Sequence, residues 1–83
     1  MAKVRLEFTV EPFVDGALGP HVRAAIDAVT AMGLVADVGP FGTTVDAPEA
    51  EAFTAVQTLL AAAFGEGATR VSLQATSLNG GSA

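Results

Sequence analysis

Polar side chains that can hold a small molecule recur at alternate positions in two segments of the sequence. In the N-terminal segment VRLEFTVE, Glu7, Thr9 and Glu11 alternate with apolar residues, and Ser72 and Gln74 alternate similarly near the other end. Hydroxyls and amides both donate and accept hydrogen bonds, and a carboxylate binds a charged donor strongly. On neighbouring strands, these groups would orient a ligand that carries amines or a positive charge. The same pattern is typical of a solvated or subunit-facing sheet surface, and we expect that role for Glu7.

The segment VGPFGTTVD, residues 38–46, combines a turn with two further candidate ligands. Two glycines and a proline indicate the turn, and Thr43 and Thr44 follow it directly. Because side chains alternate along a strand, only one of the two threonines can share a face with Thr9. The spacing leaves open which one. No lysine follows the second glycine, so this is not a phosphate-binding loop of the Walker type.

The remaining inventory excludes several classes of function. The chain has no cysteine and a single histidine, His21, which we expect to be exposed and without a metal. Four Lys and Arg residues stand against nine Asp and Glu, giving a net charge of -5, which argues against nucleic-acid binding. No nucleophile, base and orienting group can be assembled, so we expect no catalytic residues and no enzyme. The N-terminus lacks the apolar core of a signal peptide and no apolar run is long enough to span a membrane, so the expected location is the cytoplasm.

The hydrophobic pattern predicts the elements that position these groups. Strands are expected at residues 4–10, 34–38, 43–47 and 69–78, and helices at residues 20–33 and 49–64. Asp46 and Glu49 resemble a capping box for the second helix, which carries a predicted core stripe of Phe53, Val56, Leu60 and Phe64.

The order β-α-β-β-α-β predicts an α+β, ferredoxin-like sandwich in one domain, residues 1–78, followed by a flexible tail, residues 79–83. The first and third strands should lie at the centre of a four-stranded antiparallel sheet, with both helices on one face. Hydrophobic residues make up 51% of the chain and the mean hydropathy is +0.49. That is more than one small core needs, so part of it should be buried against another subunit.

Four short motifs occur in a fixed order along the chain. They are a first strand ending at Pro12, Gly33-Leu34 before the second strand, Pro40-Phe41-Gly42-Thr43 in the hairpin, and Gly67-Ala68-Thr69-Arg70-Val71 before the last strand. This set resembles the small thiamine-binding family of ferredoxin-like proteins, the YkoF-like group. Two positions depart from the family pattern: Ala47 stands where a glycine is frequent, and Glu11 where some members have an aromatic residue.

The resemblance implies a non-catalytic binding protein for thiamine or its hydroxymethylpyrimidine half, acting as a carrier, buffer or sensor. It implies no cofactor apart from that ligand, and homodimers or homotetramers whose sheets associate through edges and faces. Thr43 is the first choice for a ligand contact. The expected ligand-binding set is Thr43, Thr9, Glu11, Ser72, Gln74 and Thr44. The alternative is a regulatory or assembly module of the same fold that binds another small metabolite, such as an amino acid.

Overall fold

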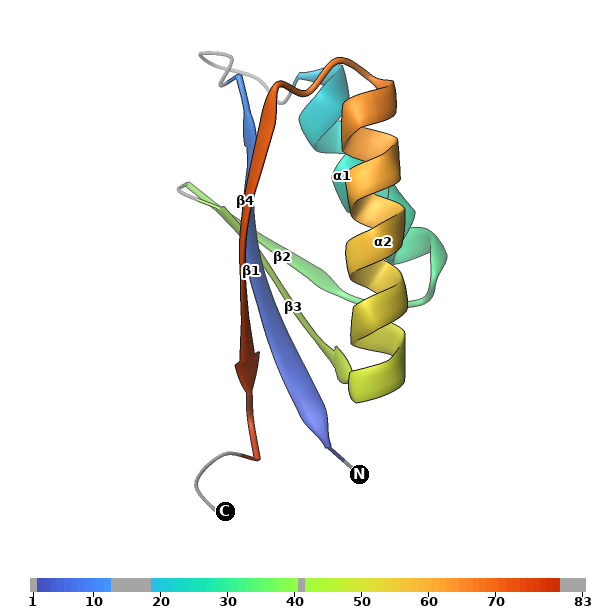
Figure 1. Ribbon diagram of the computed structural model, residues 1–83, viewed down its shortest axis with the longest axis vertical. Helices are drawn as coiled ribbons and strands as arrows, with labels where there is room; N and C mark the ends of the chain where they lie inside the picture. The colour runs from blue at the N-terminus through green and yellow to red at the C-terminus, as the bar shows by residue number, and fades with distance from the viewer. Residues whose placement is uncertain (1, 13–18, 41, 80–83) are drawn as a thin grey trace.

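The chain forms the expected βαββαβ sandwich (Figure 1). The computed structural model describes residues 2–12, 19–40 and 42–79. Its elements are β1 (Lys3–Glu11), α1 (Pro20–Ala31), β2 (Ala36–Gly39), β3 (Gly42–Pro48), α2 (Glu49–Gly65) and β4 (Arg70–Ser77). The strands form one antiparallel sheet in the order β2-β3-β1-β4, which confirms the ferredoxin-like fold with β1 and β3 at its centre.

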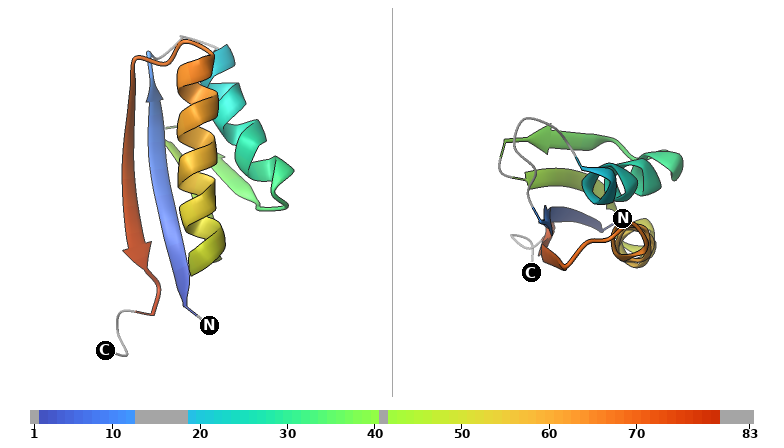
Figure 2. Two further views of the ribbon diagram at one scale, coloured as in Figure 1. Left: turned by 45° about the vertical axis from the view of Figure 1, so that its right-hand side comes forward. Right: turned by 90° about the horizontal axis from the view of Figure 1, so that it is seen from above.

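Strand β1 divides the sheet into a covered and an open face. Its residues alternate between buried and more exposed, and the buried set is the predicted one: Val4, Leu6, Phe8 and Val10. Both helices lie over that side, with α1 nearer to β2 and α2 nearer to β4 (Figure 2). No helix of the described residues covers the opposite face, so the odd-numbered side chains of β1 remain accessible there.

Both helices end in the same way, at a glycine with positive φ. Gly33 has φ 84° and Gly67 has φ 97°, values that residues with a Cβ atom rarely adopt. After α1, the Leu34 amide donates to the Val29 carbonyl at 3.3 Å, and after α2 the Ala68 amide donates to the Ala63 carbonyl at 3.0 Å. These are Schellman motifs, and they turn the chain sharply toward the following strand.

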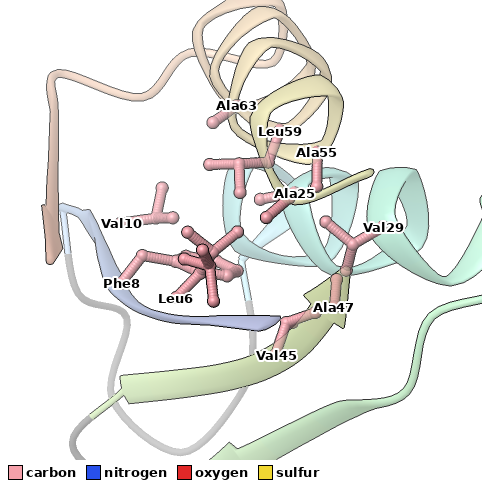
Figure 3. Packing of buried hydrophobic residues seen from close by; sticks show 12 residues of the cluster. Leu6, Phe8, Val10, Ala25, Val29, Val45, Ala47, Ala55, Leu59 and Ala63 are labelled. Atoms are coloured by element: carbon pink, nitrogen blue, oxygen red, sulfur yellow. The ribbon is translucent and has the colours of Figure 1, made fainter. Parts of the chain in front are cut away.

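The core lies between β1, β3 and the two helices (Figure 3). Leu6 is 0% exposed and stands near the middle of the cluster. The other buried apolar side chains are Val4, Phe8, Val10, Ala25, Val29, Val45, Ala47, Ala52, Ala55, Leu59 and Ala63. Helix α2 contributes three alanines to this set, which allows its backbone to approach the sheet and α1 closely.

The predicted core stripe of α2 is therefore wrong. The buried residues are Ala52, Ala55, Leu59 and Ala63, whereas Phe53 is 60% and Phe64 is 50% exposed. Because the helix is apolar almost all round, periodicity did not single out one stripe. The helix buries mainly its alanines, and Phe53 and Phe64 lie about a quarter turn around the helix from the buried side.

Two further predictions need correction. Asp46 does not cap α2, because β3 continues to Pro48 and that residue occupies the N-cap without a side-chain hydrogen bond. His21 is buried and not exposed, and its Nε2 atom forms a hydrogen bond with the Pro12 carbonyl. That contact joins the start of α1 to the end of β1. The loop segment 13–18, Phe41 of the hairpin motif and tail residues 80–83 lie outside the described residues.

Candidate ligand site on the open face

The strand registers place the open-face side chains in rows that run across the sheet. In the central row, Glu7 of β1 lies between Thr44 of β3 and Gln74 of β4. Asp37 of β2 pairs with Thr44 and extends the row to the sheet edge. Directly opposite residues of antiparallel strands point to the same face, so these side chains are neighbours.

The adjacent row is closed by the tip of the β2–β3 hairpin. Thr9 pairs with Ser72 on one side, and on the other side it approaches Gly42. A Cβ atom at Gly42 would lie 3.1 Å from the Phe8 carbonyl oxygen and 3.3 Å from Cγ2 of Thr9. The missing side chain thus lets the hairpin lie against β1. Figure 1 shows the hairpin tip reaching past β1 on the side away from the helices.

The two rows and the hairpin tip enclose a shallow pocket with a volume of about 510 Å³. This size falls in the range typical of small-molecule sites. Polar side chains of the open face and residues of the β2–β3 hairpin form most of the pocket lining. Phe8 and Leu73 also border it, although their side chains point to the covered face. The lining residues are Glu7, Phe8, Thr9, Gly39, Pro40, Gly42, Thr43, Thr44, Ser72, Leu73 and Gln74.

Two arginines of the open face, Arg5 and Arg70, are already paired with carboxylates. Arg5 donates to Asp46 through Nε at 2.8 Å and through Nη2 at 3.0 Å. These hydrogen bonds, followed by the attraction of the guanidinium charge, lower the pKa of Asp46 below its usual value. At the other end of β1, Nε of Arg70 lies 3.7 Å from Oε2 of Glu11 and forms a second ion pair.

Glu7 lies between these two ion pairs and takes part in neither. Within the described part of the chain, Glu7 makes no hydrogen bond and no salt bridge. Its negative charge acts only weakly on Arg5, two residues away in β1. A carboxylate among hydroxyls and an amide, with its hydrogen-bonding capacity unused, is suited to a ligand that donates protons or carries positive charge. This pocket presents no free cation from the described residues for an anionic ligand.

The structure brings most of the sequence-predicted site residues together. Thr9, Thr44, Ser72 and Gln74 all line the pocket from the open face. Thr43 also borders it, but it pairs with Phe8 and is 5% exposed, so its side chain points to the covered face. Its role as a ligand contact stays a prediction.

Glu11 is not among the pocket-lining residues, whereas Glu7 is at the centre of the site. Sequence analysis assigned Glu7 to a solvated surface because alternation alone cannot distinguish the carboxylates of β1. The distinguishing signal is the identity of the cross-strand partners: Glu11 meets Arg70, and Glu7 meets only neutral groups.

Other kinds of site find little support in the described residues. They contain no group of three or more His, Cys, Asp or Glu side chains close enough to hold a metal ion. No helix among them has the length and apolar character needed to cross a membrane.

The fold and the site together define a small ferredoxin-like α+β domain with a polar pocket on the open face of its sheet. This chain belongs to the thiamine-binding protein family, whose sequence pattern matches residues 6–76. The match runs from β1 to β4 and includes every strand that contributes to the pocket. None of the proteins of curated function matches the chain significantly.

Solved structures agree with this assignment. A Thermotoga maritima protein described as a candidate thiamine biosynthesis/salvage protein is 32% identical, with a TM-score of 0.66 over 90% of this chain and 81% of that one. A Streptococcus pneumoniae protein is 25% identical, with a TM-score of 0.56 over 90% of this chain and 83% of that one. A hypothetical protein of Methanocaldococcus jannascii, 18% identical with a TM-score of 0.66 over 90% and 77% of the two chains, shares the fold.

Proposed function

We propose that this protein binds thiamine or its hydroxymethylpyrimidine moiety in the open-face pocket and does not transform it chemically. The observation that carries the proposal is the unpaired Glu7 carboxylate at the centre of a pocket lined by neutral polar groups. Membership of the thiamine-binding protein family supports the choice of ligand.

The chemistry of the ligand complements that of the pocket. Thiamine combines an aminopyrimidine, which donates and accepts hydrogen bonds, with a positively charged thiazolium ring. Glu7 supplies the negative charge for the amine or the cation, and a charge-assisted bond of this kind is stronger than a neutral one. Thr9, Thr44 and Ser72 supply hydroxyls, and Gln74 an amide, that can both donate and accept.

The proposed role is that of a carrier, buffer or sensor, acting in the cytoplasm. The described residues of the pocket offer one carboxylate and several neutral groups, and this set lacks a nucleophile paired with a base. Binding without turnover is the function that such a set supports best.

Calorimetric titration with thiamine, hydroxymethylpyrimidine and thiamine diphosphate tests the proposal. We expect Glu7→Gln to weaken thiamine binding at least about 10-fold, because a hydrogen bond to a charged group is worth roughly 1.5–3 kcal/mol. Glu51→Gln is the matched control, since it removes an exposed carboxylate of α2, which lies over the opposite face of the sheet from the pocket (Figure 2). Thiamine diphosphate should bind more weakly than thiamine, because the described lining of the pocket contains no Lys or Arg for its phosphates.

A thermal-shift experiment gives an independent measurement. Thiamine at 100 times its dissociation constant should stabilise the fold by roughly 2.7 kcal/mol. Absence of saturable binding of thiamine and hydroxymethylpyrimidine to the folded wild type would contradict the proposal. So would unchanged affinity in Glu7→Gln.

The same titrations separate the alternative, an amino-acid-binding module. An amino acid would satisfy Glu7 with its ammonium group, but its carboxylate needs a donor or cation, and Arg5 and Arg70 are both paired. We therefore expect no amino acid to compete with thiamine. Selective stabilisation by one amino acid would favour the alternative.

A further inference from the structure

An ion pair stands just beyond each end of the open-face pocket. On β1, Arg5 stands two positions before Glu7, which lines the pocket. Glu11 stands two positions after Thr9, which lines the other end. Residues two positions apart on a strand point to the same face and lie ~6.8 Å apart. Each ion pair is therefore one row of side chains away from the groups that we propose to hold the ligand.

The two ion pairs differ in how tightly they are formed. Arg5 donates two hydrogen bonds to Asp46, at 2.8 and 3.0 Å. Arg70 approaches Glu11 only to 3.7 Å, which is beyond hydrogen-bond distance, and its side chain is 73% exposed. An exposed ion pair of this kind contributes little free energy, so Arg70 can change its partner more easily than Arg5.

Strand β4 places Arg70 within reach of the pocket. Arg70 stands two positions before Ser72, which lines the pocket opposite Thr9, and both side chains of β4 lie on the open face. A guanidinium group binds phosphate through two parallel hydrogen bonds. If Arg70 were released from its carboxylate, it would supply a phosphate-binding cation at this end of the pocket. The described lining itself contains no Lys or Arg.

The backbone holds Glu11 beside this arginine. The register pairs Glu11 directly with Arg70. The Thr69 amide donates to the Glu11 carbonyl at 2.8 Å, and Oγ1 of Thr69 donates to the same carbonyl at 3.3 Å. Because the end of β1 is tied to the start of β4 in this way, the Glu11 carboxylate stays next to the guanidinium that it neutralises.

We propose that Glu11 is a specificity-determining residue, which retains Arg70 in an ion pair and thereby keeps the pocket selective for ligands without a phosphate. This inference rests on the proposed function and adds the residue that separates phosphorylated from unphosphorylated forms of one ligand. Glu11 acts without touching the ligand. Its carboxylate repels a phosphate, and it occupies the cation that would otherwise bind one.

The net charge of -5 offers a less specific explanation for the same selectivity. A general negative field weakens the binding of any anion, whichever carboxylate contributes to it. Salt screens such a field over about 8 Å at physiological ionic strength. The proposal differs because it requires one particular carboxylate, and because the effect of removing that carboxylate depends on the presence of Arg70.

Calorimetric titration with thiamine and thiamine monophosphate tests the proposal, and the quantity compared is the ratio of the two dissociation constants. We expect Glu11→Gln to lower the ratio of monophosphate to thiamine at least about 3-fold, because the released Arg70 gains a phosphate partner. The double variant Glu11→Gln/Arg70→Gln should return the ratio to near its wild-type value. Glu51→Gln is the control for the loss of one negative charge, since this exposed carboxylate of α2 lies over the opposite face, and it should leave the ratio unchanged.

Asp46→Asn compares the two ends of the pocket. The asparagine carbonyl can still accept a hydrogen bond from Arg5, so this variant should change the ratio much less than Glu11→Gln. Thermal unfolding of each variant verifies that folded proteins are compared.

The outcomes separate this inference from the proposed function. Saturable thiamine binding with an unchanged ratio in Glu11→Gln would overturn the inference alone. So would a gain that persists in the double variant, or an equal gain in Asp46→Asn or Glu51→Gln. A wild type that binds neither thiamine nor its monophosphate would contradict the proposed function, and the inference with it.

Discussion

The two faces of β1 carry different properties of this protein. On the covered face, four apolar side chains are buried by the helices, and none has a polar atom to satisfy. On the open face, two ion pairs flank a pocket lined by neutral polar groups and one unpaired carboxylate, Glu7. Because adjacent residues of one strand point to opposite faces, the two properties are separated by a single position in the sequence.

This separation means that stability and ligand binding should respond to different substitutions. Burial of apolar area dominates the free energy of folding, whereas exposed polar groups contribute little to it. The open face can therefore vary its polar side chains to suit a ligand while the covered face holds the fold. We expect one exception to this separation. Gly42 lies against Phe8 and Thr9 of β1, so a substitution there should affect both stability and binding.

Leu6→Ala should have the largest effect and should act on stability alone. Leu6 is fully buried, and removing a buried leucine side chain typically costs about 2–5 kcal/mol. Glu7→Ala, one residue along, should change the free energy of unfolding by less than about 0.5 kcal/mol. Urea denaturation of the two variants measures the difference. Equal losses would show that the two faces are not separable.

Gly42→Ala should affect both properties. The new Cβ atom would press on the Phe8 carbonyl and the Thr9 methyl group, forcing the hairpin away from β1 at a cost of roughly 1–3 kcal/mol. The pocket would widen, and thiamine binding should weaken as well. Gly39→Ala is the matched control, because among the described residues its Cβ would meet only the Gly42 carbonyl oxygen, at an ordinary 3.4 Å. A neutral Gly42→Ala would contradict the close approach as the reason for glycine.

The fold could be predicted from the sequence because its signals are local. The alternation of apolar residues in β1 predicted that strand, and the glycines after each helix predicted where the helices end. All four predicted core residues of β1 are buried. The face of α2 could not be predicted in the same way. Apolar residues occur all round this helix. The helix packs so close to α1 and the sheet that alanines fit in the interior and phenylalanines do not, and this closeness is not visible in the sequence.

The sequence predicted which polar side chains of β1 and β4 share the open face, but not how they are arranged across the strands. Thr9, Ser72 and Gln74 were assigned correctly to one face because they share the alternation of their own strands. The choice between Thr43 and Thr44 depends on the pairing of β3 with β1, which the hairpin sequence does not specify. The place of Glu7 in the proposed site depends on the uncharged residues beside it on β3 and β4, so it could not be read from β1 alone.

The two threonines of β3 sharpen the comparison between the faces. Thr44→Val should weaken thiamine binding by about 5-fold, the effect of losing one neutral hydrogen bond, and leave stability unchanged. Thr43→Val should leave binding unchanged. Thr43 is buried on the covered face, so replacing its hydroxyl with a methyl group, which is less costly to bury, should maintain or raise the free energy of unfolding. The reverse outcome would make Thr43 the ligand contact.

The smallest effect is expected from the ion pair at the far end of the open face. Hydrogen bonds from Arg5 lower the pKa of Asp46 in the folded state, so the folded chain binds fewer protons there than the unfolded chain. The stabilisation is present above the ordinary aspartate pKa of about 3.9 and is lost as the pH falls through the lower folded value. Asp46→Asn should remove this part of the pH dependence.

Denaturation midpoints of wild type and Asp46→Asn between neutral pH and about pH 2.5 measure the contribution. The difference should be small and should shrink in high salt, because both side chains are more than a third exposed. Arg5→Gln completes a double-mutant cycle, and in its background Asp46→Asn should have almost no further effect. A large, salt-independent difference would mean that the open face also holds the fold together, and the division between the two faces of β1 would fail.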